Sequence, residues 1–232
     1  RTLIFLAIAA LLAALASCGG TSTDNSVAET DEPAATTESA VSVGSTSGEI
    51  ITEVPAAEYS DEDLDSSWDE GDAVAITLDE TYEFTSAGVY VLTGEIDNGQ
   101  IIVDAGDDDT VRLVLDGISV TCEDGPAVVV KNADKVILTL AEGSENILAD
   151  AATYSETGDD APDAAVYSTA DLTINGGGTL SVTANYLDGI VTKDDLIITD
   201  GNINVTAVDD ALRGTDSVAI CGGTIEIDAG GD

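Results

Sequence analysis

The sequence predicts an all-β solenoid, a fold in which successive coils of the chain stack on one another. The first observation is a repeat of 22 residues over positions 188–229. Its matched pairs are Asp188/Asp210, Asp194/Asp216, Leu196/Val218, Ile198/Ile220, Gly201/Gly223, Ile203/Ile225, Val205/Ile227 and Ala207/Ala229. The second is that short segments rich in β-branched residues alternate apolar and polar side chains and are bounded by Gly, Asp and Asn. After the N-terminal apolar run, no segment shows the apolar periodicity of a helix. Coils of about 22 residues would each bury their apolar side chains on the next coil.

The charge of the chain limits its partners. Of 232 residues, 46 are acidic and 6 are basic, which gives a formal net charge of -40, and there is no His. Nucleic acid is excluded as a partner because its phosphates must be neutralised by Lys and Arg. Cations are the natural partners, although an acidic surface that only keeps a secreted protein soluble would explain the same total.

Residues 1–18 read as a lipoprotein signal peptide. The apolar run from Leu3 to Ala16 has signal-peptide length and is shorter than the roughly 20 residues of a membrane helix. It leads into LASCG at residues 15–19, which resembles a bacterial lipobox with Cys18 as the lipidated residue. We therefore expect an extracytoplasmic lipoprotein, held to the membrane by its lipid and facing the cell surface. A plain secretory signal is the alternative, and the absence of an initiator Met suggests a truncated start.

Two further regions follow the signal peptide. Residues 19–67 are rich in Thr, Ser, Ala, Asp and Glu without periodicity, which predicts a disordered acidic tether. Residues 68–232 form the predicted solenoid domain. Its first part, 68–87, does not match the later repeat and is expected to cap the open edge of the first coil. The domain looks C-terminally truncated, because Asp232 falls where another coil should begin.

Strands and one insertion are expected within the domain. The predicted strands before the clear coils are 89–92, 100–103, 111–115, 127–130 and 135–140. Residues 143–162 interrupt the pattern and predict an excursion loop, a kind of insertion that often lies on the binding face of a solenoid. Three clear coils follow from Leu172. A calcium-binding roll of nine-residue repeats is disfavoured because 22 is not a multiple of nine.

The two remaining cysteines are expected to be buried and unbridged. If Cys122 and Cys221 lie four or five coils apart, they are separated by about 20 Å. That exceeds the ~7 Å limit for the Cα atoms of a disulfide.

A column of aspartates at the coil starts is the first predicted metal site. Its members are Asp188, Asp209, Asp210 and Asp232. Stacked coils would place such carboxylates ~4.8 Å apart. Calcium binds oxygen ligands at about 2.3–2.6 Å, so two such carboxylates can bracket one ion. The absence of His and the rarity of Cys disfavour zinc and copper. Ca²⁺ is therefore the expected cofactor.

A second column of acidic residues has a simpler explanation. Asp134, Asp194 and Asp216 each lie at a turn before a strand. Asp is favoured at turns because its side chain bonds its own backbone. Turn chemistry accounts for this column without a metal ion.

Several segments together resemble one known family. They are YVLTGEI at 90–96, QIIVDA at 100–105, VRLVLDGI at 111–118, DLTINGGGTL at 171–180 and YLDGIVTKDDL at 186–196. They resemble the bacterial cell-surface carbohydrate-binding β-helix proteins, whose cellulose- and acidic-sugar-binding domains share the pectate-lyase-like fold. The resemblance covers residues 73–232 and implies a right-handed parallel β-helix that binds calcium and plant-type polysaccharide without established catalysis. The sequence departs from the family's Asp-Gly-Ile at Asp210-Ala211-Leu212.

Sugar binding would favour an exposed aromatic ring in a groove. The candidates are Trp68, Tyr154, Tyr167 and Tyr186, with Tyr154 favoured by its loop, although packing explains each of them equally simply. Cellulose and polygalacturonate are the expected polysaccharide partners. The protein is expected to be a monomer. A negatively charged polymer would need bound calcium to bridge it to so acidic a protein.

Two other functions remain open. A calcium-dependent polysaccharide lyase needs a base, and without His this would be Arg213 or Lys193 near the first aspartate column. Simple charge balance among the carboxylates is the favoured explanation of both residues. A structural surface protein or adhesin without a defined ligand is the third possibility. We expect a binding protein and no enzyme.

Overall fold

The computed structural model describes residues 59–158 and 161–231 of the chain. The predicted signal peptide with Cys18, the predicted tether up to residue 58, and Asp232 lie outside these residues. The described part is built almost entirely of strands, so the all-β prediction is confirmed. Its one helix spans four residues, and none is long and apolar enough to cross a bilayer.

The elements of the described chain are α1 (Asp61–Leu64), β1 (Val74–Leu78), β2 (Tyr82–Phe84), β3 (Gly88–Ile96), β4 (Ile101–Asp104), β5 (Thr110–Thr121), β6 (Val128–Asn132), β7 (Lys135–Leu140), β8 (Glu145–Ala149), β9 (Ala164–Ser168), β10 (Asp171–Asn175), β11 (Thr179–Ala184), β12 (Asp188–Thr192), β13 (Asp195–Ile198), β14 (Asn202–Ala207), β15 (Leu212–Gly214), β16 (Ser217–Ile220) and β17 (Thr224–Ala229).

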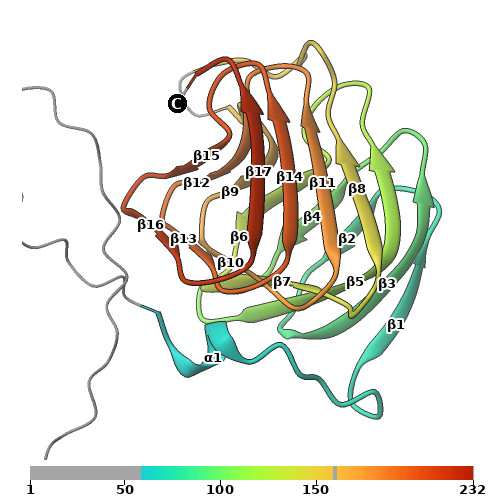
Figure 1. The fold of residues 1–232 in the computed structure, drawn as a ribbon. Helices are drawn as coiled ribbons and strands as arrows, with labels where there is room; N and C mark the ends of the chain where they lie inside the picture. Colours follow the sequence, from blue (N-terminus) through green and yellow to red (C-terminus); the bar gives the residue numbers. More distant parts are fainter. Residues whose placement is uncertain (1–58, 159–160, 232) are drawn as a thin grey trace, which may run out of the picture. The chain divides into compact units, whose positions relative to one another are not determined.

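The strands form two parallel sheets that curl into a half-barrel (Figure 1). The six-stranded sheet has the order β2-β4-β6-β9-β12-β15. The eleven-stranded sheet bends at β5, because the first half of this long strand pairs with β7 and its second half with β8. We call β5-β7-β10-β13-β16 its first arm and β5-β8-β11-β14-β17 its second arm.

The ladder registers match the predicted repeat at the C-terminal end. Leu196 pairs with Val218 and Ile203 with Ile225, each 22 positions on. One step earlier Leu172 pairs with Leu196, 24 positions on, and between β7 and β10 Val136 pairs with Leu172, 36 positions on. The step lengthens because an insertion leaves the sheets between β8 and β9 and returns without disturbing the register.

The insertion is shorter than predicted. The expected loop over 143–162 begins only after β8, which pairs with both β5 and β11. In β8 the side chains of Asn146 and Leu148 are buried, whereas Glu145 and Ile147 are exposed. This alternation is that of a strand with one buried face, and the polar residues around it obscured it in the sequence.

The core lies between the sheets and is made of Leu, Ile and Val side chains. The strands contribute alternate residues to it, and most of these side chains are completely buried. The predicted N-terminal cap continues both sheets, because β1 pairs with β3 in the eleven-stranded sheet and β2 pairs with β4 in the six-stranded sheet. Phe84 from β2 packs against the rings of Tyr82 and Tyr90 at this end of the stack.

The predicted tether does not extend to residue 67. Ser60 caps α1, since its hydroxyl accepts the Asp63 N–H while the Asp63 carboxylate accepts the Ser60 N–H. The helix contacts β10 on the first arm, and Asp63 is 1% exposed. Residues 60–65, which we call the clasp, are ordered because sheet side chains far along the chain bind them.

Both cysteines of the described chain are free, as predicted. Cys122 is buried, whereas Cys221 is exposed, so the prediction of two buried thiols is wrong for Cys221. The reason is its position directly after β16, which is the last strand of the first arm in the described chain and has a neighbour on one side only.

Candidate functional site

Two neighbouring hollows lie over the six-stranded sheet, beside the insertion that follows β8. They measure about 180 and 270 Å³. The residues lining both are Val129, Lys131, Glu156 and Pro162. Strand β6 supplies the floor and the insertion supplies one wall, so the insertion shapes this face as the sequence predicted.

An apolar strip runs across the outer side of this sheet. Val129 of β6 pairs in register with Tyr167 of β9, which pairs with Val191 of β12. Tyr167 and Val191 belong to a small cluster separate from the main core, so they face outward. The Lys193 ammonium lies 5.7 Å from the centre of the Tyr167 ring, within the range of a cation–π contact.

Three of the six basic residues of the chain gather on this sheet. Lys131 lies in β6, Lys193 directly follows β12 and Arg213 lies in β15. Lys131 is about half exposed and only 3.9 Å from a Glu83 carboxylate oxygen, a contact of little energetic value in water. In a protein of net charge -40, this face is unusual in offering exposed cations to a ligand.

The aromatic residue favoured by the sequence is not an exposed platform. Tyr154 is 8% exposed, and its hydroxyl lies 2.7 Å from the Asp150 carboxylate and 3.0 Å from the Ala164 carbonyl oxygen. Burial and the Asp150 carboxylate raise the pKa of Tyr154 well above its usual value. Its ring stacks on Tyr186 with centroids 4.3 Å apart. The insertion folds back on the sheet, and this pair anchors it.

The other two aromatic candidates are only partly buried. Tyr186 is half-buried beneath the stacked Tyr154 ring, and Trp68 is half-buried in the stretch between the clasp and β1. Neither side chain lines the hollows. Tyr167 lines the larger hollow and Tyr154 the smaller one, but Tyr167 is only 4% exposed, so neither ring is an open platform.

The first aspartate column has a cation of its own. Asp188 is buried, and its Oδ2 lies 2.7 Å from Nη2 of Arg213. The same guanidinium nitrogen lies 2.6 Å from Oδ2 of Asp163. Burial disfavours the charge on Arg213, yet the two carboxylates raise its pKa above the ordinary value. Arg213 is thus a permanent cation here.

Little of the Asp188 carboxylate is left for a metal ion. Its Oδ1 accepts a hydrogen bond from the Asp210 N–H, at 3.1 Å. Burial raises the pKa of Asp188, although the hydrogen bond from the Asp210 N–H and the charge of Arg213 oppose this shift. A calcium ion would also be repelled by Arg213, so these residues do not fit calcium. Asp209 is exposed, and Asp232 lies outside the described residues, so a site that includes Asp232 stays a prediction.

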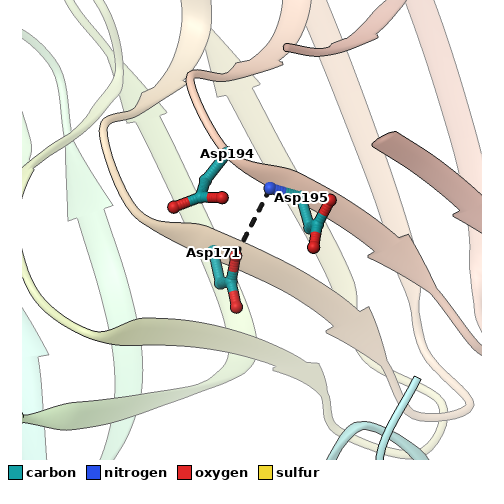
Figure 2. Close-up of side chains that lie close together, drawn as sticks. All are labelled: Asp171, Asp194 and Asp195. Atoms are coloured by element: carbon teal, nitrogen blue, oxygen red, sulfur yellow. Dashed lines mark hydrogen bonds between the residues drawn. The ribbon is translucent and has the colours of Figure 1, made fainter. Parts of the chain in front are cut away.

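A tighter group of carboxylates lies at the second column. Asp171, Asp194 and Asp195 each offer an oxygen within 4.8 Å of the others, and Figure 2 shows the three side chains converging from neighbouring strands. We call these residues the acidic cluster. Asp171 begins β10 and accepts a hydrogen bond from the Asp195 N–H at 3.3 Å. Asp195 begins β13 and accepts one from the Ser217 hydroxyl.

The members of the acidic cluster repel one another. Burial, then the charges of Asp216 and Asp195, raise the pKa of Asp194. Burial and the neighbouring Asp194 also raise the pKa of Asp171, although the Asp195 N–H and Lys135 oppose this. Oxygens within 4.8 Å of one another can all lie about 2.3–2.6 Å from a single calcium ion. The donor set and its uncompensated charge therefore fit calcium.

A third surface, the outer face of β11 and β14 in the second arm, is polar and carries no charged side chain, although the flanking strands β8 and β17 present Glu145, Glu226 and Asp228 on the same face. On β11 and β14 its partly or fully exposed residues are Thr179, Ser181, Thr183, Asn202, Asn204 and Thr206. These strands pair in register, so their hydroxyl and amide groups form three cross-strand rows. This neutrality contrasts with the acidity of the rest of the chain.

Sequence reasoning missed Lys131, Asp171 and Asp195. The two aspartates could have been found from their shared position, since each is the first residue of a strand and Asp195 directly follows a predicted column residue. Lys131 carries no motif, and only the insertion across the sheet makes it part of a hollow.

Comparisons with known proteins agree on one family and one fold. The model of the family described as "carbohydrate-binding domain-containing protein" matches residues 78–232. A carbohydrate-binding domain-containing protein of Acetivibrio thermocellus is 42% identical over 127 residues, which are 54% of this chain and 44% of that protein. The matched segment thus spans less than half of that relative. A solved structure, the gadolinium derivative of the polysaccharide lyase-like protein from C. thermocellum, is 37% identical with a TM-score of 0.63, covering 67% of this chain and 69% of the other.

Proposed function

The chain belongs to the family of carbohydrate-binding domain-containing proteins, and on this premise we propose that it binds polysaccharide without cleaving it. The observation that carries the proposal is the pair of hollows over β6 and β9, both lined by Lys131, of which the larger is also lined by Tyr167 with Lys193 over its ring. An aromatic ring and polar groups in a groove are the usual means of holding a sugar. The expected ligands are plant-type polymers, namely cellulose, polygalacturonate or both.

The proposed architecture is a right-handed parallel β-helix with about 22 residues per coil. Its support is the uniform parallel pairing of both sheets and the 22-residue offset of the last ladders. Such a stack offers long, flat outer faces on which a polymer can lie along several coils.

Two faces suit two kinds of polysaccharide. The hollows lined by Lys131, with the exposed Lys193 on the same sheet, suit an acidic polymer, because the two ammonium groups attract uronate carboxylates. The neutral face of β11 and β14 suits cellulose, whose hydroxyl groups can exchange hydrogen bonds with Thr and Asn side chains.

Calcium is the proposed cofactor, and the acidic cluster is the site that its chemistry favours. The support is the mutual distance of the Asp171, Asp194 and Asp195 oxygens and the repulsion among carboxylates that raises the pKa of Asp171 and Asp194. Bound there, calcium would neutralise the repulsion among the three carboxylates and hold the turns before β10 and β13 together.

The proposed location is the outer surface of a bacterial membrane, with the protein a monomer anchored through lipid on Cys18. This rests on the sequence of residues 1–19 alone.

One of the two candidate catalytic bases for a polysaccharide lyase, Arg213, does not suit that role. Arg213 is paired with Asp163 and Asp188 and has a raised pKa, so it cannot accept a proton at ordinary pH. Lys193 lies over the Tyr167 ring, a placement that suits a binding contact. An adhesin without a sugar ligand is the remaining alternative.

The test is retention of the full chain on cellulose and on polygalacturonate, with calcium and then with chelator, while absorbance reports unsaturated uronate product. We expect retention without product. The variant with Lys131→Gln and Lys193→Gln should lose polygalacturonate retention by about tenfold, as expected for one or two charged contacts. Formation of product would show that the protein is a polysaccharide lyase. Failure to bind either polymer would favour the adhesin without a sugar ligand.

The matched control changes the net charge equally at other exposed positions. It carries Thr121→Glu and Thr206→Glu, on β5 and on the neutral face of β14. It should bind polygalacturonate like the native protein and lose cellulose retention. If both variants lost polygalacturonate retention equally, total charge and not the hollows would govern binding.

A further inference from the structure

The clasp carries a buried carboxylate that the outer face of the first arm holds completely. Oδ1 of Asp63 accepts hydrogen bonds from Lys135 Nζ at 2.8 Å and from the Thr173 hydroxyl at 2.6 Å. Its Oδ2 accepts the N–H and the hydroxyl of Ser60, at 2.8 and 2.7 Å. Both oxygens are therefore satisfied, half by the sheet and half by the helix cap.

The sheet also binds the backbone of the clasp. The Asp63 carbonyl oxygen accepts hydrogen bonds from Asn175 Nδ2 at 3.1 Å and from the Thr199 hydroxyl at 2.8 Å. The Asp65 carbonyl oxygen accepts one from Arg112 Nη1 at 2.7 Å. These donors come from β5, β10 and the end of β13, so the clasp lies across neighbouring strands of the arm.

The groove beneath the clasp is built and polar. Thr139, Thr173 and Asn175 are completely buried there, and Thr139 links Arg112 to Asn175 by accepting one hydrogen bond and donating another. The one large apolar side chain of α1, Leu64, is 51% exposed. The clasp is thus held by hydrogen bonds and charge, and opening it would expose no large apolar side chain of its own.

The clasp is joined to the arm by side chains and belongs to no strand. Residues 66–73, which join it to β1, are exposed or half-buried and belong to no element. The contacts between the clasp and the arm run from side chains of the sheet and not through a backbone ladder.

We propose that the groove formed by Arg112, Lys135, Thr173, Asn175 and Thr199 is a docking site for a capped acidic turn, which the chain's own residues 60–65 fill as a releasable occupant. The same turn supplied by another chain competes for the groove. This surface is on the first arm and is separate from the two proposed sugar-binding faces, which lie on the six-stranded sheet and on β11 and β14 of the second arm.

The chemistry of the groove selects its occupant. A carboxylate must meet Lys135 and Thr173 while two successive carbonyl groups meet Asn175, Thr199 and Arg112. A Ser-x-x-Asp turn presents these groups together, because its cap holds the carboxylate against the backbone. A covalently attached clasp acts at an effective concentration of the order of millimolar, so a competing turn binds detectably only when the attached one is weakened.

The first test uses a labelled peptide of residues 59–67 and fluorescence anisotropy. The Asp63→Ala chain, whose own clasp lacks its carboxylate, should bind this peptide at least about tenfold more tightly than the native chain does. The same peptide with Asn in place of Asp63 should not bind, and adding Lys135→Met to the Asp63→Ala chain should abolish binding. Equal binding by the native and Asp63→Ala chains would overturn the proposal.

A second test keeps the native contacts and so does not depend on the fold of a variant. A protease site inserted between Gly71 and Asp72 allows the clasp to be cut from the folded sheets. After cutting, the clasp-bearing piece should elute with the domain at low salt and separately at 1 M NaCl. Separation at every salt concentration, or joint elution that Asp63→Asn does not weaken, would overturn the proposal.

Discussion

The outer face of the first arm carries two groups of carboxylates that behave in opposite ways. Asp63 of the clasp is buried, yet hydrogen bonds from Lys135, Thr173 and Ser60 overcome the effect of burial and lower its pKa to about 2. In the acidic cluster, burial and neighbouring carboxylates raise the pKa of Asp171 and Asp194. The two groups are adjacent, since Asp171 pairs in register with Lys135.

The difference shows where the protein supplies its own counter-charge and where it does not. Lys135 is committed to Asp63 at 2.8 Å, so it relieves the charge of Asp171 only partly. The clasp is thereby complete within the chain, whereas the acidic cluster is completed best by an external cation. The same contrast separates Asp188, which Arg213 neutralises, from the acidic cluster.

The largest expected effect comes from breaking the clasp. Lys135→Met leaves the Asp63 carboxylate buried without its cation and should lower the free energy of unfolding by about 3–5 kcal/mol. Urea denaturation measures this. Lys131→Met removes a half-exposed ion pair and should cost at most about 1 kcal/mol. Similar losses in both variants would contradict the difference drawn between buried and exposed pairs.

The next effect is that of calcium on the acidic cluster. Calcium at one hundred times its dissociation constant should stabilise the chain by about 2.7 kcal/mol, which calorimetry detects as a rise in Tm. Asp194→Asn with Asp195→Asn should remove this rise, whereas Asp209→Asn should not. Because the pKa values of Asp171 and Asp194 are raised, protons compete with calcium, and the rise should shrink as the pH falls.

The clasp should also give a pH dependence, and one that does not require calcium. Asp63 has a folded pKa of about 2 against an ordinary value of 3.8, so its carboxylate contributes stability that is full above pH ~4. This contribution, about 2 kcal/mol, is lost as the pH falls from ~4 towards 2. Asp63→Asn should flatten that part of the stability curve. An unchanged slope in the variant would mean that other carboxylates govern acid unfolding.

The smallest effect concerns the acidic cluster without calcium. Asp194→Asn removes one of several repelling charges and should raise the free energy of unfolding by less than about 1 kcal/mol in chelator. With calcium present the same variant should be less stable than the native chain. A change of sign on adding calcium is the signature of a carboxylate group built for a cation.

Much of the strand framework was predictable. The pairs Leu172/Leu196/Val218 and Leu180/Ile203/Ile225 were read from the sequence and are the pairs in the ladders. The register of such strands can be predicted from the sequence, because alternate residues of each strand face a shared core and the apolar pattern of one strand therefore repeats in the next.

The candidate site was predicted only in part. The insertion was placed on the correct stretch of chain, but Tyr154 is buried at the edge of the smaller hollow and Tyr167, also buried, lines the larger one. Asp194 was seen as a column residue, whereas its partners Asp171 and Asp195 were not. These errors arise where irregular segments cross the sheets, because such crossings follow no period.

The sequence by itself determined the all-β class, the register of the last ladders and the unbridged state of Cys122 and Cys221. Only the tertiary structure decided which carboxylates have a cation. Asp63 meets Thr173, which lies 110 positions along the chain, and Asp163 and Asp188 converge on Arg213. Periodic burial is a local property that a sequence displays directly, whereas the pairing of charges depends on how distant segments fold across one another.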